Sequence, residues 1–250
     1  MTWSIIARDD TTGEIGIAVA SRFFACGAAV PYVGARAAVA TQAFVNPLWG
    51  VEGLARLQGG EKADAVIADF RARDAGQALR QAHMMDAAGN FAAHTGADCT
   101  DWCGHLVRGD HSVAGNMLTG PEVIEETARV FAASRGTLAE RLLAAMHAGE
   151  AAGGDKRGRQ AAGLTIHRGE AYAHLSLRVD DHDDPLGELS RLLDVAGERY
   201  LMVAETFPTS GNFSGTTDRR QIDAAIVAAD AARRAAGRPS ASRATNAEED

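Results

Sequence analysis

The pattern of apolar and polar residues near the start of the chain predicts two strands. Residues 3–8 and 15–20 are apolar and rich in β-branched side chains, and the residues between them, Asp9 to Glu14, have the composition of a turn. Isoleucine occupies both sets of alternating positions, which indicates a sheet that is covered on both faces. The chain is therefore expected to open with a hairpin. A further β-rich run, residues 28–44, predicts two strands with a break between them.

Helical signals follow, and they come in pairs. Asn46 is suited to cap a helix whose first turn contains Pro47, and a second helical pattern follows directly. Further along, Pro121 opens another helix, and Thr137 with Glu140 forms a capping box for its partner. The chain thus contains two helix pairs.

The remaining apolar runs predict the other strands. These lie at residues 81–85, 91–94, 106–107, 112–113, 161–167 and 170–179, and a helix begins at Asp184-Pro185. Strands therefore occur in three groups that the helix pairs separate, whereas a parallel sheet needs single helices between single strands. The pattern predicts a layered α+β fold with antiparallel sheets.

The composition changes after residue 207. Residues 1–207 contain all the predicted strands without an internal break, and we interpret them as one domain. Residues 208–250 are expected to form a C-terminal extension, with a polar loop at 208–217, a helix at 218–236 and a disordered tail beyond Gly237.

Composition and charge exclude several classes of protein. Of the 250 residues, 46% are hydrophobic and 23% are charged, as in ordinary globular proteins. Acidic residues outnumber basic ones by 33 to 25, which argues against general nucleic-acid binding because that function needs a basic surface. No charged leader precedes an apolar run, and no apolar stretch reaches about 18 residues, so we expect neither export nor a membrane span. Three cysteines are too few for a disulfide scaffold, and we predict a cytoplasmic location.

Thr2 directly follows the initiator methionine, at the start of the first predicted strand. If Met1 is removed, Thr2 carries both a nucleophilic hydroxyl and a free amine. The unperturbed pKa of such an amine, about 7.7 to 8, lets it act as the base for its own hydroxyl. This is the chemistry of an N-terminal nucleophile hydrolase. The other interpretation is a disordered first residue with no catalytic role.

A series of motifs in residues 2–195 points to one family. In order, they are TWSIIAR at 2–8, GIAVASRF at 16–23, ATQA at 40–43 with Asn46, Pro47 and Gly50, TGA at 95–97 with Cys99, Trp102, Gly104 and His105, Gly115-Asn116, GGD at 153–155, RGRQ at 157–160 and RVDDH at 178–182. Together they resemble the uncharacterised family called domain of unknown function 1028, which is placed in the N-terminal nucleophile hydrolase superfamily. The resemblance implies a four-layer αββα sandwich, in which two antiparallel sheets face each other and helices lie outside, and it supplies no established substrate.

The resemblance also implies a role for Thr2. Members of the superfamily use the first residue of the mature chain as a nucleophile on amide bonds, and Thr2 matches that position. Peptidases of the superfamily usually pair this nucleophile with a lysine, but the first 61 residues contain none, so the basic partner would be Arg22 or Arg36. We expect Arg22 to lower the pKa of the amine and to stabilise negative charge. The alternative is a surface arginine that pairs with a carboxylate.

Four further residues are candidates for substrate binding. Thr41 and Gln42 end an apolar strand, where polar side chains either line a pocket or bond to nearby backbone. Asp155 and Arg159 lie in a basic, glycine-containing loop that is suited to hold a carboxylate by bidentate contact. The alternative there is a solvated loop with internal ion pairs.

A metal site is the main alternative chemistry. Seven residues of types that bind metal ions are close in sequence: His94, Asp98, Cys99, Asp101, Cys103, His105 and His111. However, the Cys-x3-Cys spacing has no matching second pair, and we predict neither a metal site nor a cofactor. The acidic run at residues 180–184 precedes a helix, whose positive end suits such side chains.

The sequence thus predicts an amidohydrolase that cleaves the C–N bond of a small amide, lactam or acylated amino acid through Thr2. Two alternatives stay open: a non-catalytic small-molecule-binding protein on the same fold, and a zinc-dependent hydrolase. The expected partners are a small-molecule substrate and, because of the apolar stretch Leu201-Met202-Val203, a second copy of the chain in a homo-oligomer. Neither nucleic acid nor a membrane is expected as a partner.

Overall fold

A computed structural model describes residues 2–244 of the chain. The chain divides into two compact units, Met1–Leu189 and Ser190–Asp250. The boundary that we predicted after residue 207 lies inside the second unit.

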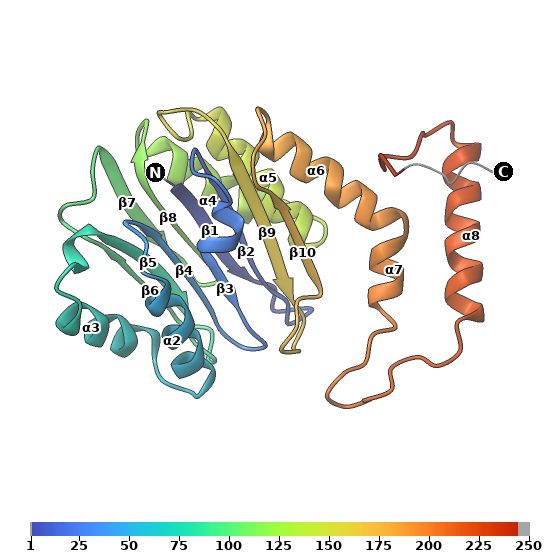
Figure 1. Ribbon diagram of the computed structural model, residues 1–250, viewed down its shortest axis with the longest axis horizontal. Coiled ribbons are helices and arrows are strands. Elements are labelled where there is room, and N and C mark those ends of the chain that lie inside the picture. Colours follow the sequence, from blue (N-terminus) through green and yellow to red (C-terminus); the bar gives the residue numbers. More distant parts are fainter. Residues whose placement is uncertain (1, 245–250) are drawn as a thin grey trace. The chain divides into compact units, whose positions relative to one another are not determined.

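The strands of the first unit form two antiparallel sheets (Figure 1). The six-stranded sheet has the order β10 (Leu175–Val179), β9 (Ala161–His167), β2 (Ile15–Ser21), β1 (Thr2–Arg8), β8 (His111–Leu118) and β7 (Trp102–Val107). The four-stranded sheet has the order β3 (Pro31–Val33), β4 (Ala38–Ala43), β5 (Arg80–Met85) and β6 (Phe91–Thr95). The mixed helix-and-strand class with antiparallel sheets is therefore confirmed.

Helices lie against both sheets. The helices of the first unit are α1 (Cys26–Ala29), α2 (Pro47–Gln58), α3 (Ala63–Arg73), the short 3₁₀ turn η1 (Gln77–Leu79), α4 (Glu122–Ala133), α5 (Leu138–Ala151) and the beginning of α6 (Pro185–Val195). The helices α2 and α3 contact strands of the small sheet, and α4 and α5 contact strands of the large sheet. Strands of the two sheets also contact each other directly, β1 with β4 and β5 with β8. The face of β1 that does not meet the small sheet is therefore covered by α5.

The core follows from this arrangement. Ile5 and Ile6 are neighbours on opposite faces of β1, and both are fully buried, which confirms the expectation of a sheet covered on both faces. Between the sheets, Ile6 packs with Ile17 and Met85, among others. A second cluster lies between the small sheet and its helices and includes Trp49 and Phe70.

Local signals in the sequence account for the predicted turns and caps. In the opening hairpin, the Asp9 carboxylate accepts hydrogen bonds from the backbone N–H groups of Thr11 and Thr12 at 2.8 and 3.1 Å. The following Gly13 has a φ of +74°, a conformation that glycine adopts without a steric penalty. The side chain of Asn46 caps α2 by accepting from Leu48 N at 3.0 Å. The capping box of α5 is also present.

Several elements differ from the sequence-based prediction. The strands expected at 106–107 and 112–113 are longer, since β7 begins at Trp102 and β8 runs from His111 to Leu118. The strand expected at 170–179 begins only at Leu175, because Gly169 turns the chain with a left-handed backbone conformation after β9. The short helix α1 was not predicted, since its four residues are too few to show a helical period.

The second unit contains the π-helical turn η2 (Ala196–Tyr200), α7 (Leu201–Ala204) and α8 (Arg220–Ala235). Its later residues are tied to its first ones, because Glu198 accepts hydrogen bonds from the Ser240 hydroxyl and from Ala241 N, each at 2.6 Å. We predicted a disordered tail beyond Gly237. The structure describes this segment as far as residue 244, and residues 245–250 lie outside the described residues. Across the described helices, none is both long and apolar enough to cross a membrane.

Candidate functional site

A layer of buried polar side chains lies between the two sheets and extends from the start of β1 past its middle. Its members face inward from strands of both sheets: Thr2 and Ser4 of β1, Ser21 of β2, Gln42 of β4, Gln81 and His83 of β5, and Ser112 and Asn116 of β8. All of them are buried. Buried polar groups are costly unless they are hydrogen-bonded, so the bonds among them determine what this layer does.

Thr2 lies at the first position of β1, paired with Asn116 across the sheet. Its hydroxyl oxygen is 3.1 Å from that of Ser21 on the neighbouring strand. Its carbonyl oxygen accepts hydrogen bonds from the side-chain amides of Gln42 at 3.3 Å and Asn116 at 3.4 Å. With 6% of its surface exposed, Thr2 is a buried member of the layer.

Three amide side chains hold each other in one orientation. Gln42 and Asn116 both donate to the side-chain oxygen of Gln81, at 2.8 and 3.0 Å. The amide nitrogen of Gln81 in turn donates to the carbonyl oxygen of Gly115 at 2.8 Å. The two amides that contact Thr2 are therefore themselves positioned by a third.

A histidine flanked by two serines occupies the same layer. The Ser4 hydroxyl donates to the side-chain oxygen of Gln42 at 2.7 Å, so its oxygen accepts from Nε2 of His83 at 2.9 Å. Nδ1 of this neutral imidazole then accepts from the Ser112 hydroxyl at 3.0 Å. Burial, with a smaller contribution from nearby His105, lowers the pKa of His83 to about 3. His83 is thus neutral and serves to join the two sheets.

Arg22 and Asp155 meet beside this layer, although 133 positions separate them in sequence. The backbone N–H of Arg22 donates to Oδ2 of Asp155 at 2.8 Å, and that of Arg157 donates to Oδ1 at 2.8 Å. The Asp155 side chain is almost completely buried, and the guanidinium of Arg157 lies 3.3 Å from it. Asp155 therefore positions the end of β2, directly after Ser21, and its oxygens are engaged by the chain itself.

The structure does not bring the remaining candidates, Thr41, Gln42 and Arg159, together in one site. The hydroxyl of Thr41 donates to the backbone oxygen of Asn46 at 3.3 Å, the local backbone bond that was one of its two interpretations. Gln42, one position later, faces the opposite side of the strand and contacts Thr2. Arg159 pairs with Glu150 and lies 3.9 Å from Asp184.

A polar cavity of about 340 Å³ brings Arg22 and Arg159 together. Its lining is completed by Gln160, Asp181, His182 and Asp183. Asp184 of the same acidic run accepts from Gly187 N at 3.2 Å at the start of α6, as the helix-end interpretation expects.

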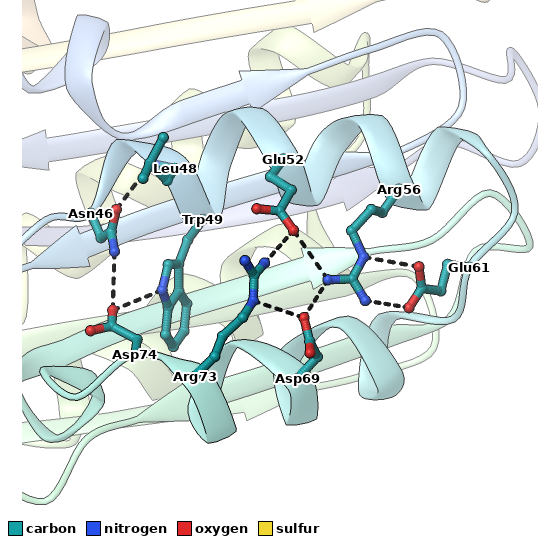
Figure 2. A network of polar contacts seen from close by, with 9 residues as sticks. All are labelled: Asn46, Leu48, Trp49, Glu52, Arg56, Glu61, Asp69, Arg73 and Asp74. Carbon is teal, nitrogen blue, oxygen red and sulfur yellow. Dashed lines mark hydrogen bonds and ion pairs between the residues drawn. The ribbon is translucent and has the colours of Figure 1, made fainter.

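A second cavity, of about 260 Å³, lies between α2 and α3 and is part of a structural network. Figure 2 shows how the two helices are joined there: Arg56 pairs with Glu61 and Asp69, and Arg73 reaches Glu52 and Asp69. Nearby, Asp74 accepts from Asn46 at 3.0 Å and from the Trp49 indole at 2.9 Å (Figure 2), and the hydrogen bonds to this carboxylate lower its pKa although burial opposes them. The charged side chains around this cavity are therefore hydrogen-bonded or ion-paired with one another and join α2 to α3.

Two of the histidines suggested for a metal site form other contacts. His94 Nε2 lies 2.9 Å from the backbone oxygen of Gln77, and His105 Nδ1 lies 2.8 Å from the Thr95 hydroxyl. Within residues 2–244, no group of three His, Cys, Asp or Glu side chains is placed to hold a metal ion. The zinc-dependent alternative therefore has no assembled ligand set in this part of the chain.

Sequence reasoning identified Thr2, Arg22 and Gln42 but missed the residues that connect them. Ser4, Gln81, His83 and Ser112 were not among the candidates, and Asn116 entered only as part of a motif. These residues share one feature in the sequence: each is a polar residue at an inward-facing position of a largely apolar strand, as Gln81 and His83 are on either side of Ala82.

Comparison with known proteins places the chain in a family. A family model described as "Family of unknown function (DUF1028)" matches residues 2–189, which end where the first compact unit ends. The crystal structure of protein SPO2555 from Silicibacter pomeroyi, which is assigned to the same family model, is similar with a TM-score of 0.81 and 32% sequence identity. The similarity covers 87% of this chain and 96% of that one. A search of curated proteins gives no match. The chain belongs to the family of unknown function DUF1028.

Proposed function

We propose that the protein is an N-terminal nucleophile amidohydrolase that cleaves the C–N bond of a small amide, lactam or acylated amino acid through Thr2. The observation that carries this proposal is the position of Thr2 at the start of a central strand, with its hydroxyl 3.1 Å from Ser21 and its carbonyl held by two amides. Within the proposal, the sheets and their helices form the four-layer αββα sandwich of that superfamily.

The reaction starts once Met1 has been removed. The nitrogen of Thr2 is then an amine, with an unperturbed pKa of about 7.7 to 8, and it takes the proton of the Thr2 hydroxyl. The hydroxyl oxygen forms a bond to the substrate carbonyl carbon, the C–N bond breaks, and the leaving nitrogen takes the proton. Water then hydrolyses the ester, which releases the acid and restores the hydroxyl.

The neighbours of Thr2 have defined roles in this mechanism. Ser21 can donate a hydrogen bond to the Thr2 oxygen as it loses its proton, which favours the nucleophilic form. Gln42 and Asn116 position the Thr2 backbone, and Arg22 supplies positive charge to stabilise negative charge in the transition state. Asp155 is a positioning residue because it holds the backbone of Arg22.

A non-catalytic binding protein on the same fold is the second candidate. It is favoured by the 6% exposure of Thr2 and by the presence of a polar cavity whose lining contains Arg22 but not Thr2. A chain that keeps Met1 would have this cavity without a free amine on Thr2.

Intact-mass spectrometry combined with two substitutions distinguishes these functions. The amidohydrolase is expected to lack Met1, to lose turnover in Thr2→Ala and to keep it in Thr2→Ser, because serine retains the hydroxyl. Turnover would be measured as release of primary amine from a panel of N-acyl amino acids, small amides and lactams. Active protein that retains Met1, or an active Thr2→Ala variant, would rule out this mechanism.

A further inference from the structure

The polar cavity beside β2 is built from three segments that the backbone holds together. Ala25 N donates to Asp180 O at 3.1 Å, and His182 N donates to Gln160 O at 2.8 Å. The Asp155 carboxylate fixes Arg22 at the end of β2. The cavity walls are therefore positioned before any ligand binds, which reduces the entropic cost of binding.

Most charged groups of the lining already have partners. Arg159 pairs with Glu150, and Asp181 accepts from the Gln160 amide at 3.1 Å. His182 Nδ1 lies 2.9 Å from Asp184 N and 3.1 Å from the Asp183 carboxylate. By contrast, the guanidinium of Arg22 has no hydrogen-bond or ion-pair partner among residues 2–244. Arg22 is thus the cation of this cavity that is available to a ligand.

We propose that this cavity binds the carboxylate of the substrate through Arg22, so that the substrates are acylated amino acids rather than neutral amides or lactams. This inference rests on the proposed amidohydrolase function, but it assigns Arg22 to the carboxylate of the substrate instead of to the negative charge in the transition state. A guanidinium binds a carboxylate through two parallel hydrogen bonds, and these are among the stronger hydrogen bonds in proteins.

Arg22 is next in sequence to the residue that contacts the Thr2 hydroxyl. Arg22 directly follows Ser21, whose hydroxyl is 3.1 Å from the Thr2 hydroxyl. In an acylated amino acid, one carbon atom separates the carboxylate from the nitrogen of the scissile amide. A carboxylate bound at Arg22 therefore brings the amide to the neighbourhood of the nucleophile.

The acidic side chains of the cavity limit the charge of the ligand. Asp181 and Asp183 belong to the same lining as Arg22, and Asp183 has a side chain that is 96% exposed. A second negative charge on the ligand would be repelled by these carboxylates. The ligand is accordingly a monoanion, and the carboxylate oxygens of the lining can accept hydrogen bonds from its N–H group.

The test measures binding without turnover, on the full chain with Thr2→Ala. The probes are N-acetyl-L-alanine and its neutral analogue N-acetyl-L-alaninamide, and affinities are measured by calorimetry or ligand-observed NMR. We expect the acid to bind at least about tenfold more tightly than the amide, since only the acid pairs with Arg22. Adding Arg22→Gln is expected to weaken binding of the acid about tenfold and to leave binding of the amide unchanged. Arg71→Gln, which removes the same charge from an exposed position on α3, is the matched control and leaves both affinities unchanged.

Equal affinity for the acid and the amide, an unchanged affinity in Arg22→Gln, or no saturable binding of the acid at millimolar concentration would each overturn the inference. These results differ from a failure of the proposed function. Retention of Met1 in active protein would refute the role of Thr2 but not the preference for a carboxylate. Conversely, an active Thr2-dependent enzyme that binds the acid and the amide equally would keep the mechanism and lose this substrate class.

Discussion

At the scale of single residues, the polar layer between the sheets is stabilised by mutual satisfaction of its hydrogen bonds. Ser4, His83 and Ser112 form a chain in which each hydroxyl and each imidazole nitrogen has a partner. An unpaired buried donor or acceptor costs about 1–3 kcal/mol. Removing one of these side chains is therefore expected to destabilise the fold, because its partner stays buried without a hydrogen bond. The same bonds hold Gln42, and through it the carbonyl of Thr2, in a fixed position.

The buried histidine predicts a loss of stability in mild acid. His83 has an ordinary pKa of 6.5 when unfolded and about 3 when folded, so between these values the unfolded chain binds the proton and the folded chain does not. Stability therefore falls as the pH falls through this range. Between about pH 6.5 and about pH 4.5, His83 alone is expected to remove about 2 kcal/mol from the free energy of unfolding.

Urea unfolding at several pH values checks this prediction. The variant His83→Gln keeps a donor and an acceptor but does not titrate, so its stability should depend less on pH than that of the wild type. His147→Gln, at an exposed position on α5, is the control and should keep the pH dependence of the wild type. Identical pH profiles for wild type and His83→Gln would contradict the assigned burial of a neutral imidazole.

At the scale of elements, local chemistry and close packing contribute differently. The helices α2 and α5 begin where their capping residues are, and β1 and β2 join at the turn that Asp9 and Gly13 form. The helix α1 has no such signal and depends on packing. It packs against β9, and Gly27 of α1 lies next to Gly163 of β9. The contact requires glycine at position 163, because a Cβ atom there would lie only 2.6 Å from the Cα atom of Gly27.

The contact between these glycines predicts the effect of a small substitution. Gly163→Ala is expected to lower the free energy of unfolding by about 1–3 kcal/mol, because the added methyl group collides with the backbone of Gly27. Gly109→Ala is the control, since no atom lies within 4 Å of a Cβ built there. Its effect should stay below about 1 kcal/mol. Chemical denaturation of both variants measures the difference, and equal stabilities would contradict a close contact between α1 and β9.

At the scale of the whole molecule, the large sheet combines distant parts of the chain. Its central strands β1 and β2 come from the first residues, β7 and β8 from the middle, and β9 and β10 from near residue 170. The first unit therefore completes its core only after its last strands are in place. The family match, residues 2–189, includes all of these strands.

The homo-oligomer stays a prediction at this scale. Its basis is the apolar stretch Leu201 to Val203, which forms most of α7 and is half-buried in the second unit. We expect light scattering at micromolar concentration to show a mass above that of the monomer. Met202→Glu should shift the protein toward the monomer because it places a charge in an apolar contact. Val227→Glu adds the same charge at an exposed position of α8 and should have no effect. A wild-type protein that is only monomeric would remove this expectation.

The sequence by itself determined the strands, the helix pairs and their caps. These features depend on neighbours along the chain: the apolar, β-branched runs of β1 and β2, the Asn46 cap, and the Thr137 capping box. The same local information identified Thr2 as a nucleophile candidate, since that inference needs only its place beside Met1. It also predicted antiparallel sheets, because the order of strands and helix pairs is itself a property of the sequence.

Only the tertiary structure decided which side chains meet. Ser4 and His83 are 79 positions apart, and Arg22 and Asp155 are 133 apart, so no local pattern relates them. The tertiary structure also decided the role of each residue within one loop. Asp155 is buried against backbone N–H groups, whereas Arg159, four positions later, is exposed at a cavity. The physical reason is that strand pairing fixes which face a residue occupies, and sheet packing then fixes what lies opposite that face.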